Sequence, residues 1–431
     1  MKRISIIVGC MVLLVVGIFV FTSQDQEQVL VEDDTLDENT SLVFMLQEED
    51  GTYKKSDSLP SSGYSFNATK SVCSNGATPT WEDNRLYLNN LTSNGTSCYL
   101  YFDIKPLAMN TILANKIISD ERSGAITGLF TTNTTGIVYR VEDDWGDSYI
   151  FAGAPTDNWL YFANYYWRII RINGDGSIRL IYSGNKQSGP SEIGENTQIG
   201  TSPFNEQNTD NAYVGYMYGS IGASSYASTH TNTNNSSVKI LLDNWYLDNL
   251  LQYAQYISTE AGFCNDRNLL DESDDLWSSD TKLGYGDNET AYGIYKRLVE
   301  QNHGPKKEQI PSLKCVRSND LFTVDKSSKG NHDLVYPIGL ITGDEVVLAG
   351  SFFGNNSNSY YLYTNQSYWT MTPFIYDYAW SRVLMLNENG GLNYQMVNNG
   401  SGVRPVINLS ADVSLSGTGT MSDPYVVEGA E

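Results

Sequence analysis

The chain has 431 residues, with 27 Lys plus Arg against 50 Asp plus Glu and a formal net charge of −23. This length supports more than one domain with its own core, which excludes a small scaffold that depends on disulfides alone. The negative charge repels phosphate backbones and excludes a general nucleic-acid partner. Aromatic residues make up 12% of the chain and 30 residues are Tyr, a composition typical of folded β-rich domains rather than of disorder.

Residues 1–22 are predicted to form a transmembrane helix. Lys2 and Arg3 precede Ile4 to Phe21, which are 18 residues without a charge, near the length that crosses the hydrocarbon layer. Small residues typical of a cleavage site are missing after Phe21, which favours an uncleaved signal-anchor over a cleaved signal peptide. An acylated Cys10 is a further alternative. We therefore expect a single-pass protein of the cell membrane, anchored by its N-terminal helix, with the C-terminal part extracellular.

Four cysteines remain after Cys10, an even number in a chain with a secretory start, so disulfide bonds are expected. Four cysteines allow three pairings, and local closure favours Cys73 with Cys98 and Cys264 with Cys315. A metal site is the competing interpretation. The cysteines lack C-x-x-C spacing and the three histidines form no H-E-x-x-H motif, so no metal site is predicted.

Residues 23–40 carry seven acidic residues and no basic one, which indicates an extended, self-repelling stalk. Residues 41–105 change to short alternating runs with Asn75-Gly76 and Asn94-Gly95 as turn signals, a pattern that predicts a small β-module. A Cys73–Cys98 bond in this module would close a loop of about 25 residues and contribute roughly 3 kcal/mol to its stability.

Residues 106–410 are expected to form a larger domain, followed by a C-terminal β tail at 411–431. Leu107 to Ile118 and Val238 to Ile257 have apolar residues at helical spacing. Tyr166 to Ile172 and Ser177 to Tyr182 alternate on either side of Asn173-Gly174-Asp175-Gly176, which predicts a hairpin.

Cofactor signals are weak. Asn173, Asp175 and Ser177 resemble the start of a calcium loop, but the distal Glu of an EF-hand is missing and turn chemistry explains them. Acidic clusters at 142–147 and 271–275 could hold a surface Ca²⁺, although solvated loops explain them equally. No other cofactor is expected. The chain contains no P-loop, no G-x-S-x-G motif and no dinucleotide-binding motif between a strand and a helix, so it is not predicted to be an enzyme.

One late stretch is the most informative. It reads Y-W-T-M-T-P at 368–373, A-W-S-R-V-L-M-L at 379–386, N-G-G at 389–391 and G-V-R-P-V-I-N-L at 402–409. This order resembles the C-terminal half of the C-type-lectin-like fold found in bacterial surface proteins and, more distantly, in formylglycine-generating enzymes. Exported Gram-positive proteins also carry phrases similar to residues 165–182 and 337–346, so the resemblance covers about 106–409.

The resemblance implies a C-type-lectin-like mixed α/β domain with twisted antiparallel sheets, helices packed on one side and long irregular loops. Together with the predicted transmembrane helix and the small disulfide-bonded β-sandwich-like module, the expected fold class is α+β. It also implies ligand contacts on the late loops and strands. No cysteine follows Cys315, so the oxidative chemistry of formylglycine-generating enzymes does not carry over. The calcium-dependent sugar-binding motifs of classical lectins are missing as well. The resemblance can therefore indicate the fold of this chain without indicating its ligand.

The late loops are rich in Tyr, Ser, Gly and Asn, which supply amphipathic area and adaptable hydrogen bonds at binding surfaces. Tyr376, Asp377 and Tyr378 are expected to be exposed, whereas Trp369, Phe374 and Trp380 are expected to be packed, because large aromatic side chains are most often packed. Arg404 is expected to hold the closing strand rather than to bind a carboxylate. The predicted ligand-binding residues are Tyr376, Asp377, Tyr378, Trp380, Tyr394, Asn398 and Asn399.

These observations predict a membrane-anchored extracellular recognition or adhesion protein that binds a glycan or a surface protein through its Tyr/Asn-rich loops. The alternative is a structural or assembly component of the cell surface without a free ligand. Exposed aromatic side chains on the late loops would favour the first function over the second.

Overall fold

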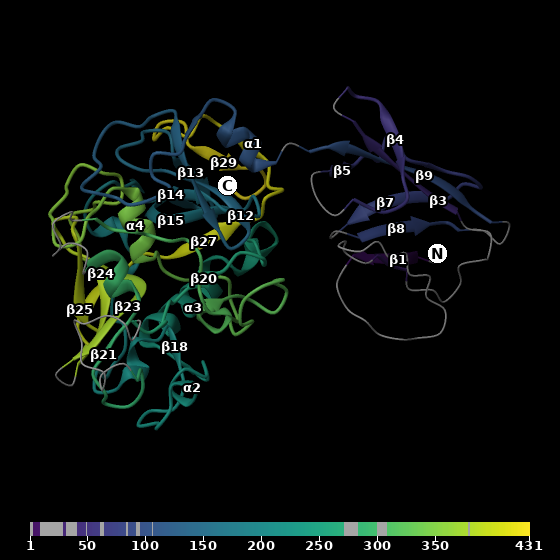
Figure 1. Ribbon diagram of the computed structural model, residues 1–431. Helices are drawn as coiled ribbons and strands as arrows, with labels where there is room; N and C mark the ends of the chain where they lie inside the picture. Colours follow the sequence, from purple (N-terminus) through teal and green to yellow (C-terminus); the bar gives the residue numbers. More distant parts are fainter. Residues whose placement is uncertain are drawn as a thin grey trace. The chain divides into compact units, whose positions relative to one another are not determined.

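The computed structural model describes residues 3–8, 29–31, 41–48, 50–60, 64–82, 85–91, 95–105, 107–270, 283–299, 308–377 and 380–431. The chain divides into two compact units, Met1–Leu107 and Ala108–Glu431, which are considered separately below (Figure 1).

The first unit is built from two sheets. One has the strand order β2-β1-β8-β7, and the other has the order β4-β3-β9-β5 with β6 also paired to β9. The strands are β1 Arg3–Val8, β2 Val29–Val31, β3 Ser41–Gln47, β4 Tyr53–Ser56, β5 Tyr64–Phe66, β6 Val72–Cys73, β7 Thr78–Glu82, β8 Arg85–Asn89 and β9 Ser97–Ile104.

Alternation along β9 explains how these two sheets share a core. Its even-numbered residues from Cys98 to Phe102 are buried while Ser97 and Tyr99 are exposed, as expected for a strand with one covered face. Leu100 and Phe102 of β9 pack in one cluster with Leu86 and Leu88 of β8. The predicted Cys73–Cys98 disulfide is confirmed and joins β6 to β9.

The prediction of an α+β fold with a transmembrane helix is wrong. The protein is mostly β, with 36% strand and 15% helix. Arg3–Val8, at the start of the expected helix, form β1, which pairs antiparallel with β2 and β8. Ile4, Ile6, Ile7 and Val8 are β-branched, which favours extended backbone. Within the described part of the chain, no helix has both the length and the apolar character needed to cross a membrane. Residues 1–2 and 9–22, the rest of the expected helix, lie outside the described residues, as does the predicted stalk at 23–40 apart from the strand Val29–Val31.

The second unit contains a ten-stranded sheet with the path β10-β11-β12-β14-β13-β29-β28. β15 extends it by pairing with β14, β16 and β27. The strands are β10 Ile117–Ser119, β11 Ile137–Asp143, β12 Gly146–Ile150, β13 Trp159–Phe162, β14 Tyr165–Ile172, β15 Ile178–Asn185, β16 Gly189–Pro190, β27 Val406–Leu409, β28 Leu415–Ser416 and β29 Tyr425–Val427. Residues 411–431, expected to form a separate tail, thus contribute β28 and β29 to this sheet.

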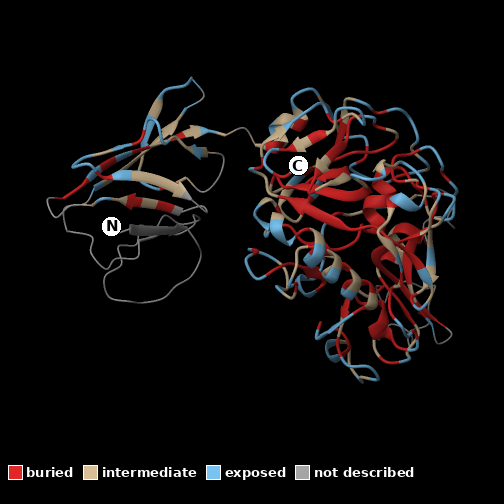
Figure 2. Ribbon diagram, turned by 180° about the vertical axis from the view of Figure 1, so that it is seen from behind, coloured by how far each residue is buried: buried red, intermediate tan, exposed pale blue. Residues whose placement is uncertain are grey.

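The β14–β15 hairpin is the centre of this sheet, and it confirms the hairpin predicted from its alternation and turn residues. The N–H of Asn173 donates to the carbonyl of Ser177 at 2.8 Å, and Gly176 takes a φ of 83°, which a side chain would disfavour. Both faces of the two strands are almost wholly buried (Figure 2).

A second, six-stranded sheet carries the late part of the chain, with the path β17-β26-β23-β24-β25 and β21 paired to β23. Its strands are β17 Gly200–Pro203, β21 Thr290–Ala291, β23 Tyr368–Asp377, β24 Trp380–Leu386, β25 Leu392–Met396 and β26 Gly400–Val403. Two short pairs complete the described strands, β18 Met217–Tyr218 with β19 Asn234–Asn235 and β20 Phe263–Cys264 with β22 Leu321–Phe322.

Apart from α3, with 13 residues, the helices in the described part of this unit are short. The α-helices are α1 Ala108–Leu113, α2 Tyr226–Thr229, α3 Ser237–Asn249 and α4 Gly343–Ala349; the 3₁₀ segments are η1 Glu195–Thr197, η2 Asn211–Val214, η3 Leu251–Tyr256 and η6 Ser318–Asp320; and η4 Tyr295–Val299 is a π-helical turn. The predicted helix at 107–118 ends early because Ile117–Ser119 pair with β11 as β10. The predicted helix at 238–257 is α3 followed by the 3₁₀ turn η3.

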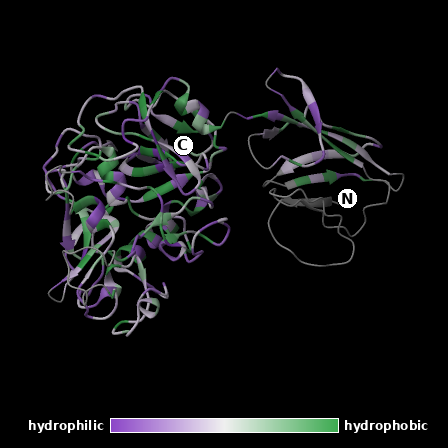
Figure 3. Cartoon of the chain, viewed as in Figure 1, coloured by the Kyte–Doolittle hydropathy of each residue, from purple (hydrophilic) through white to green (hydrophobic). Residues whose placement is uncertain are grey.

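Apolar side chains of both sheets and of α1, α3 and α4 form one core in the second unit, and hydrophobic residues lie along its strands (Figure 3). Fully buried α4 begins with a capping box, in which Thr342 accepts from the N–H of Glu345 and the Glu345 side chain accepts from the N–H of Thr342. This cap places Glu345 at a fixed position in the interior.

Candidate functional site

An aromatic surface lies on β25, the edge strand of the six-stranded sheet, and on its neighbour β24. Trp380 and Arg382 are two residues apart on β24 and therefore share one face of the sheet. Tyr394 of β25 lies opposite Leu384, which belongs to the same face. Trp380 and Tyr394 are 41% and 40% exposed, so the expectation that Trp380 is packed is wrong. We define the aromatic surface as Trp380, Arg382 and Tyr394.

A stack of aromatic rings packs against the ring of Tyr394. Its ring lies 4.7 Å from that of Phe374 at an interplanar angle of 20°, and Phe374 lies 5.5 Å from Tyr295 at 25°. Phe353 also stacks on Tyr394, with centroids 6.4 Å apart. Offset stacking of this kind holds a ring in one orientation. The position of the Tyr394 ring is therefore fixed by packing.

Arg382 lies between the two exposed rings. Its guanidinium carbon is 5.9 Å from the ring centroid of Trp380 and 5.3 Å from that of Tyr394, within the range of cation–π attraction. Its Nη2 also lies 3.2 Å from Oδ1 of Asp377, the residue paired with Trp380 across the hairpin. The aromatic surface thus has an ion pair at its centre.

The predicted ligand-binding residues divide into two groups. Trp380, Tyr394 and Asn398 are exposed and Asn399 is half-buried, so all four are accessible to a ligand. Asn398 accepts from Nδ2 of Asn208 at 3.0 Å, and Nδ2 of Asn399 donates to Gln395 at 3.0 Å. Tyr378 lies outside the described residues.

The expectation that Tyr376 and Asp377 are exposed is wrong. Tyr376 is 1% exposed and its hydroxyl donates to the carbonyl of Thr209 at 3.1 Å. Asp377 is 7% exposed. Every residue of β23 is buried, because other parts of the unit cover both of its faces. Trp369 and Phe374 of the same strand are packed as predicted.

Arg404 holds the closing strand, as predicted. It is buried, and its Nε and Nη2 donate to the carbonyl of Tyr182 at 3.1 and 2.8 Å. Its guanidinium also stacks over the ring of Tyr368. All of these contacts are internal, which assigns Arg404 to structure rather than to binding.

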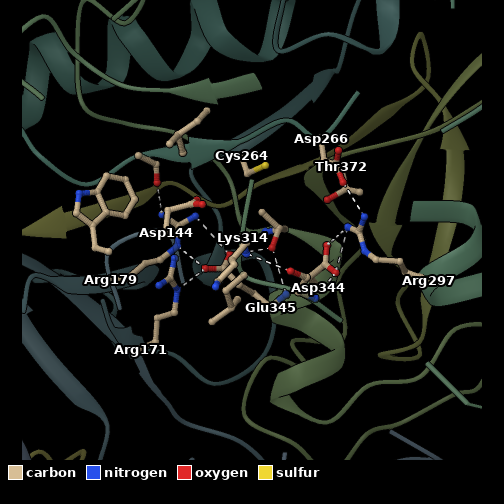
Figure 4. Close-up of a pocket in the computed structure, with 16 residues that line it drawn as sticks. Asp144, Arg171, Arg179, Cys264, Asp266, Arg297, Lys314, Asp344, Glu345 and Thr372 are labelled. Atoms are coloured by element: carbon tan, nitrogen blue, oxygen red, sulfur yellow. Dashed lines mark hydrogen bonds and ion pairs between the residues drawn. The ribbon is translucent and has the colours of Figure 1, made fainter. Parts of the chain in front are cut away.

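A second cluster, of charged side chains, lines a narrow pocket (Figure 4). Residues 312–314, which precede Cys315, form part of its wall. On one side, Glu345 of α4 accepts from Nε of Arg171 at 3.0 Å and lies 2.5 Å from Nε of Arg179. Arg171 also pairs with Asp143 at 2.5 Å. Burial alone would raise the pKa of Glu345, yet the charges of Arg179 and Arg171 bring it below the ordinary value.

On the other side of the pocket, Arg297 pairs with Asp266 at 2.8 Å and with Asp344 at 3.1 Å. Burial raises the pKa of Asp344 despite the opposing charge of Arg297. The predicted Cys264–Cys315 disulfide is confirmed beside these groups. The N–H of Cys315 donates to Asp144 at 3.0 Å. This hydrogen bond connects residues 312–315 to Asp144 on the pocket wall.

The cavity volume of this pocket is about 30 Å³, enough for a few water molecules. Glu345, Asp266 and Asp344 are paired with guanidinium groups, whereas Asp144 accepts from the N–H of Cys315. No group of three or more His, Cys, Asp or Glu residues suited to a metal ion occurs in the described ranges. The acidic cluster at 271–275 lies outside those ranges. The pocket therefore acts as a buried ion-pair network and offers no room for a substrate.

Sequence reasoning missed Arg382, Arg171, Arg179 and Glu345. Arg382 follows Trp380 by two residues in a stretch that alternates as a strand does. This spacing places both side chains on one face of a strand and could have indicated Arg382. No local signal links Glu345 to Arg171, because 174 residues separate them.

Comparison with known proteins gave no match to this chain among protein-family models, curated proteins or solved structures.

Proposed function

We propose that this protein is an exported recognition protein that binds a glycan through the aromatic surface of Trp380, Arg382 and Tyr394. The single observation that carries this proposal is the exposure of two large rings on a rigid sheet edge. The rings flank a guanidinium, and the nearby Asn398 and Asn399 supply amide groups. Ordered aromatic rings with amide groups beside them are typical of binding surfaces.

Export is supported by the disulfides. Two bonds, Cys73–Cys98 and Cys264–Cys315, occur in separate units, and such bonds persist in oxidising compartments. A surface-facing recognition role is consistent with that environment.

The size of the aromatic surface favours a glycan over a protein partner. A large aromatic side chain has on the order of 200 Å² of surface, so two rings exposed by about 40% present roughly 160 Å². A stable protein interface needs about 800 Å² on each partner. Within the described part of β23, β24 and β25, no other large apolar side chain is exposed. The exposed apolar area of Trp380 and Tyr394 matches the area of one or two sugar rings.

The test is binding of the full chain to an immobilised panel of neutral and anionic oligosaccharides, with Trp380→Ala and Tyr394→Ala as the variants. We expect binding to at least one oligosaccharide and a loss of about tenfold or more in each variant, the equivalent of 1.4 kcal/mol. Leu247→Ala is the matched control, because Leu247 is a large apolar residue of similar exposure on α3. Binding that is unaffected by both ring substitutions would overturn the proposal.

A further inference from the structure

Asn398 lies beside Trp380 at one end of the aromatic surface. The pairing of β24 with β25 continues in the same register to Val397, whose N–H donates to the carbonyl of Ser381 at 3.1 Å. One residue further along, Asn398 therefore takes the position opposite Trp380. Both residues are exposed, so an amide group and an indole ring lie next to each other at the surface.

Asn208 holds the amide of Asn398 in one orientation. Nδ2 of Asn208 donates to Oδ1 of Asn398 at 3.0 Å and lies 3.9 Å from Sδ of Met396, a weak acceptor. Asn208 itself is buried. Because Oδ1 of Asn398 accepts this hydrogen bond, its Nδ2 carries the donors that remain, and they have no hydrogen-bond partner within the described part of the chain.

The neighbouring nitrogen groups of this surface are also donors. The indole N–H of Trp380 and the guanidinium of Arg382 make no hydrogen bond to the described residues, although Arg382 forms an ion pair with Asp377. Oδ1 of Asp377 is buried against that guanidinium and is not available to a ligand. These three nitrogen groups therefore call for hydrogen-bond acceptors on the ligand.

Apolar area accompanies these donors. Met396 is paired with Arg382 across β24 and β25 and lies two residues from Tyr394, so its half-buried side chain shares the face of the exposed rings. A thioether and aromatic rings pack favourably against small apolar groups. The surface therefore combines N–H donors with contact area for a methyl group.

An acetamido group on a sugar matches this combination. Its carbonyl oxygen has two lone pairs and can accept from two donors, and its methyl group can pack on Met396 or on a ring. A hydroxyl group also accepts, but it carries a donor of its own, for which the donors of Asn398 and Trp380 offer no partner. The acetamido group is uncharged, whereas an anionic group would be repelled by a chain with a net charge of −23.

We propose that the ligand of the aromatic surface contains an N-acetylated amino sugar and that Asn398 and Trp380 donate to the carbonyl oxygen of its acetamido group. This inference rests on the proposed function and adds the class of sugar and the residues that determine specificity. It assigns stacking area to Trp380 and Tyr394, methyl contact to Met396 and recognition of the carbonyl to the two N–H groups.

The test compares binding of the full chain to sugars that carry either an acetamido or a hydroxyl group at the same position. Oligosaccharides of N-acetylglucosamine and of glucose with the same linkage and length form one pair, and N-acetylgalactosamine and galactose form the second. We expect the native chain to bind the acetamido member of at least one pair about tenfold more tightly than the hydroxyl member, since a site built for one hydrogen-bonding group discriminates against its replacement.

Asn398→Asp is the decisive variant, because its carboxylate can still accept from Asn208 but has no N–H donor. The preference for the acetamido sugar should fall from about tenfold to less than about threefold. Trp380→Phe keeps a ring and loses the indole N–H, so it should lower the preference as well. Asn393→Asp is the matched control, since it makes the same change of charge on the opposite face of β25 and should leave the preference unchanged.

The ratio between the two members of a pair separates recognition from folding, because a variant that merely loosens the hairpin weakens binding to both equally. Near-ultraviolet circular dichroism verifies that each variant stays folded. If Asn398→Asp and Trp380→Phe both keep the full preference, recognition of the carbonyl by these residues is overturned. An equal loss in Asn393→Asp would also overturn it, because charge alone would then explain the effect.

Failure of this inference is distinguishable from failure of the proposed function. If both members of each pair bind equally, or if other sugars of the panel bind and these pairs do not, the acetamido assignment is overturned and glycan binding stands. Preferential binding of sulfated or carboxylated sugars would have the same consequence. If no oligosaccharide binds, both proposals are overturned.

Discussion

Glu345 of α4 accepts a hydrogen bond of 3.0 Å from Nε of Arg171 of β14, and both side chains are buried. Arg179 of β15 approaches the same carboxylate from the neighbouring strand of the hairpin. One carboxylate thus joins the central hairpin of the large sheet to α4. The capping box at Thr342 fixes the backbone that carries this carboxylate.

Glu345→Gln should destabilise the second unit by about 3–5 kcal/mol, because it leaves two buried guanidinium groups without sufficient compensating charge. Denaturant unfolding followed by tryptophan fluorescence measures this change. Glu192→Gln is the matched control, since Glu192 is 63% exposed and lies 3.7 Å from the buried Arg168. That control should change stability by less than about 1 kcal/mol. Equal effects of the two substitutions would contradict a structural role for Glu345.

Stability should also depend on pH through Glu345. Its pKa in the folded state is below the ordinary value of 4.5, so the native state binds this proton less readily than the unfolded state does. The stabilising contribution is therefore complete above about pH 4.5 and is lost as pH falls through the lower, folded-state pKa. Unfolding midpoints measured between neutral and acidic pH should fall more steeply for the native chain than for Glu345→Gln. Parallel curves would show that other groups cause the acid sensitivity.

Replacing Cys264 and Cys315 together by Ser should lower the stability of the second unit. The bond spans a sequence separation of 51 residues, and the loop-entropy estimate for that length is about 4 kcal/mol. Thermal unfolding under non-oxidising conditions measures the loss. The double substitution of Cys73 and Cys98 serves as the control, since it should destabilise the first unit and leave the transition of the second unchanged. A shift of the second transition in that control would indicate that the units unfold together.

Arg404→Met should cost about 2–3 kcal/mol, because the carbonyl of Tyr182 loses two charged donors in a buried position. Met keeps much of the apolar stem, so the loss reports mainly on the guanidinium. Arg140→Met, which removes an exposed arginine paired with Asp120, should cost less than about 1 kcal/mol. Calorimetry of both variants distinguishes these values, and a negligible effect at Arg404 would contradict its role in holding the closing strand.

Local signals determined several features of this protein. The β14–β15 hairpin follows from alternation around a turn that contains Gly176, and the two disulfides follow from the separation of four cysteines. Packing of Trp369 follows from its size and apolar character. Each of these depends on residues close in sequence or on the chemistry of one side chain.

The tertiary structure decided the rest. Tyr376 and Trp380 are four residues apart in one polar, aromatic stretch, yet one is buried and the other exposed, because β23 is covered on both faces while β24 leads to the edge of the sheet. Ile4 to Val8 have a hydrophobicity that suits a membrane helix or a strand equally, and pairing with β8 selects the strand. Asp377 and Arg382 form an ion pair only because a hairpin brings them together, beside two rings that belong to different strands. Sequence determines which side chains are available, whereas the covering of each sheet face and the pairing of distant strands determine which of them meet a ligand.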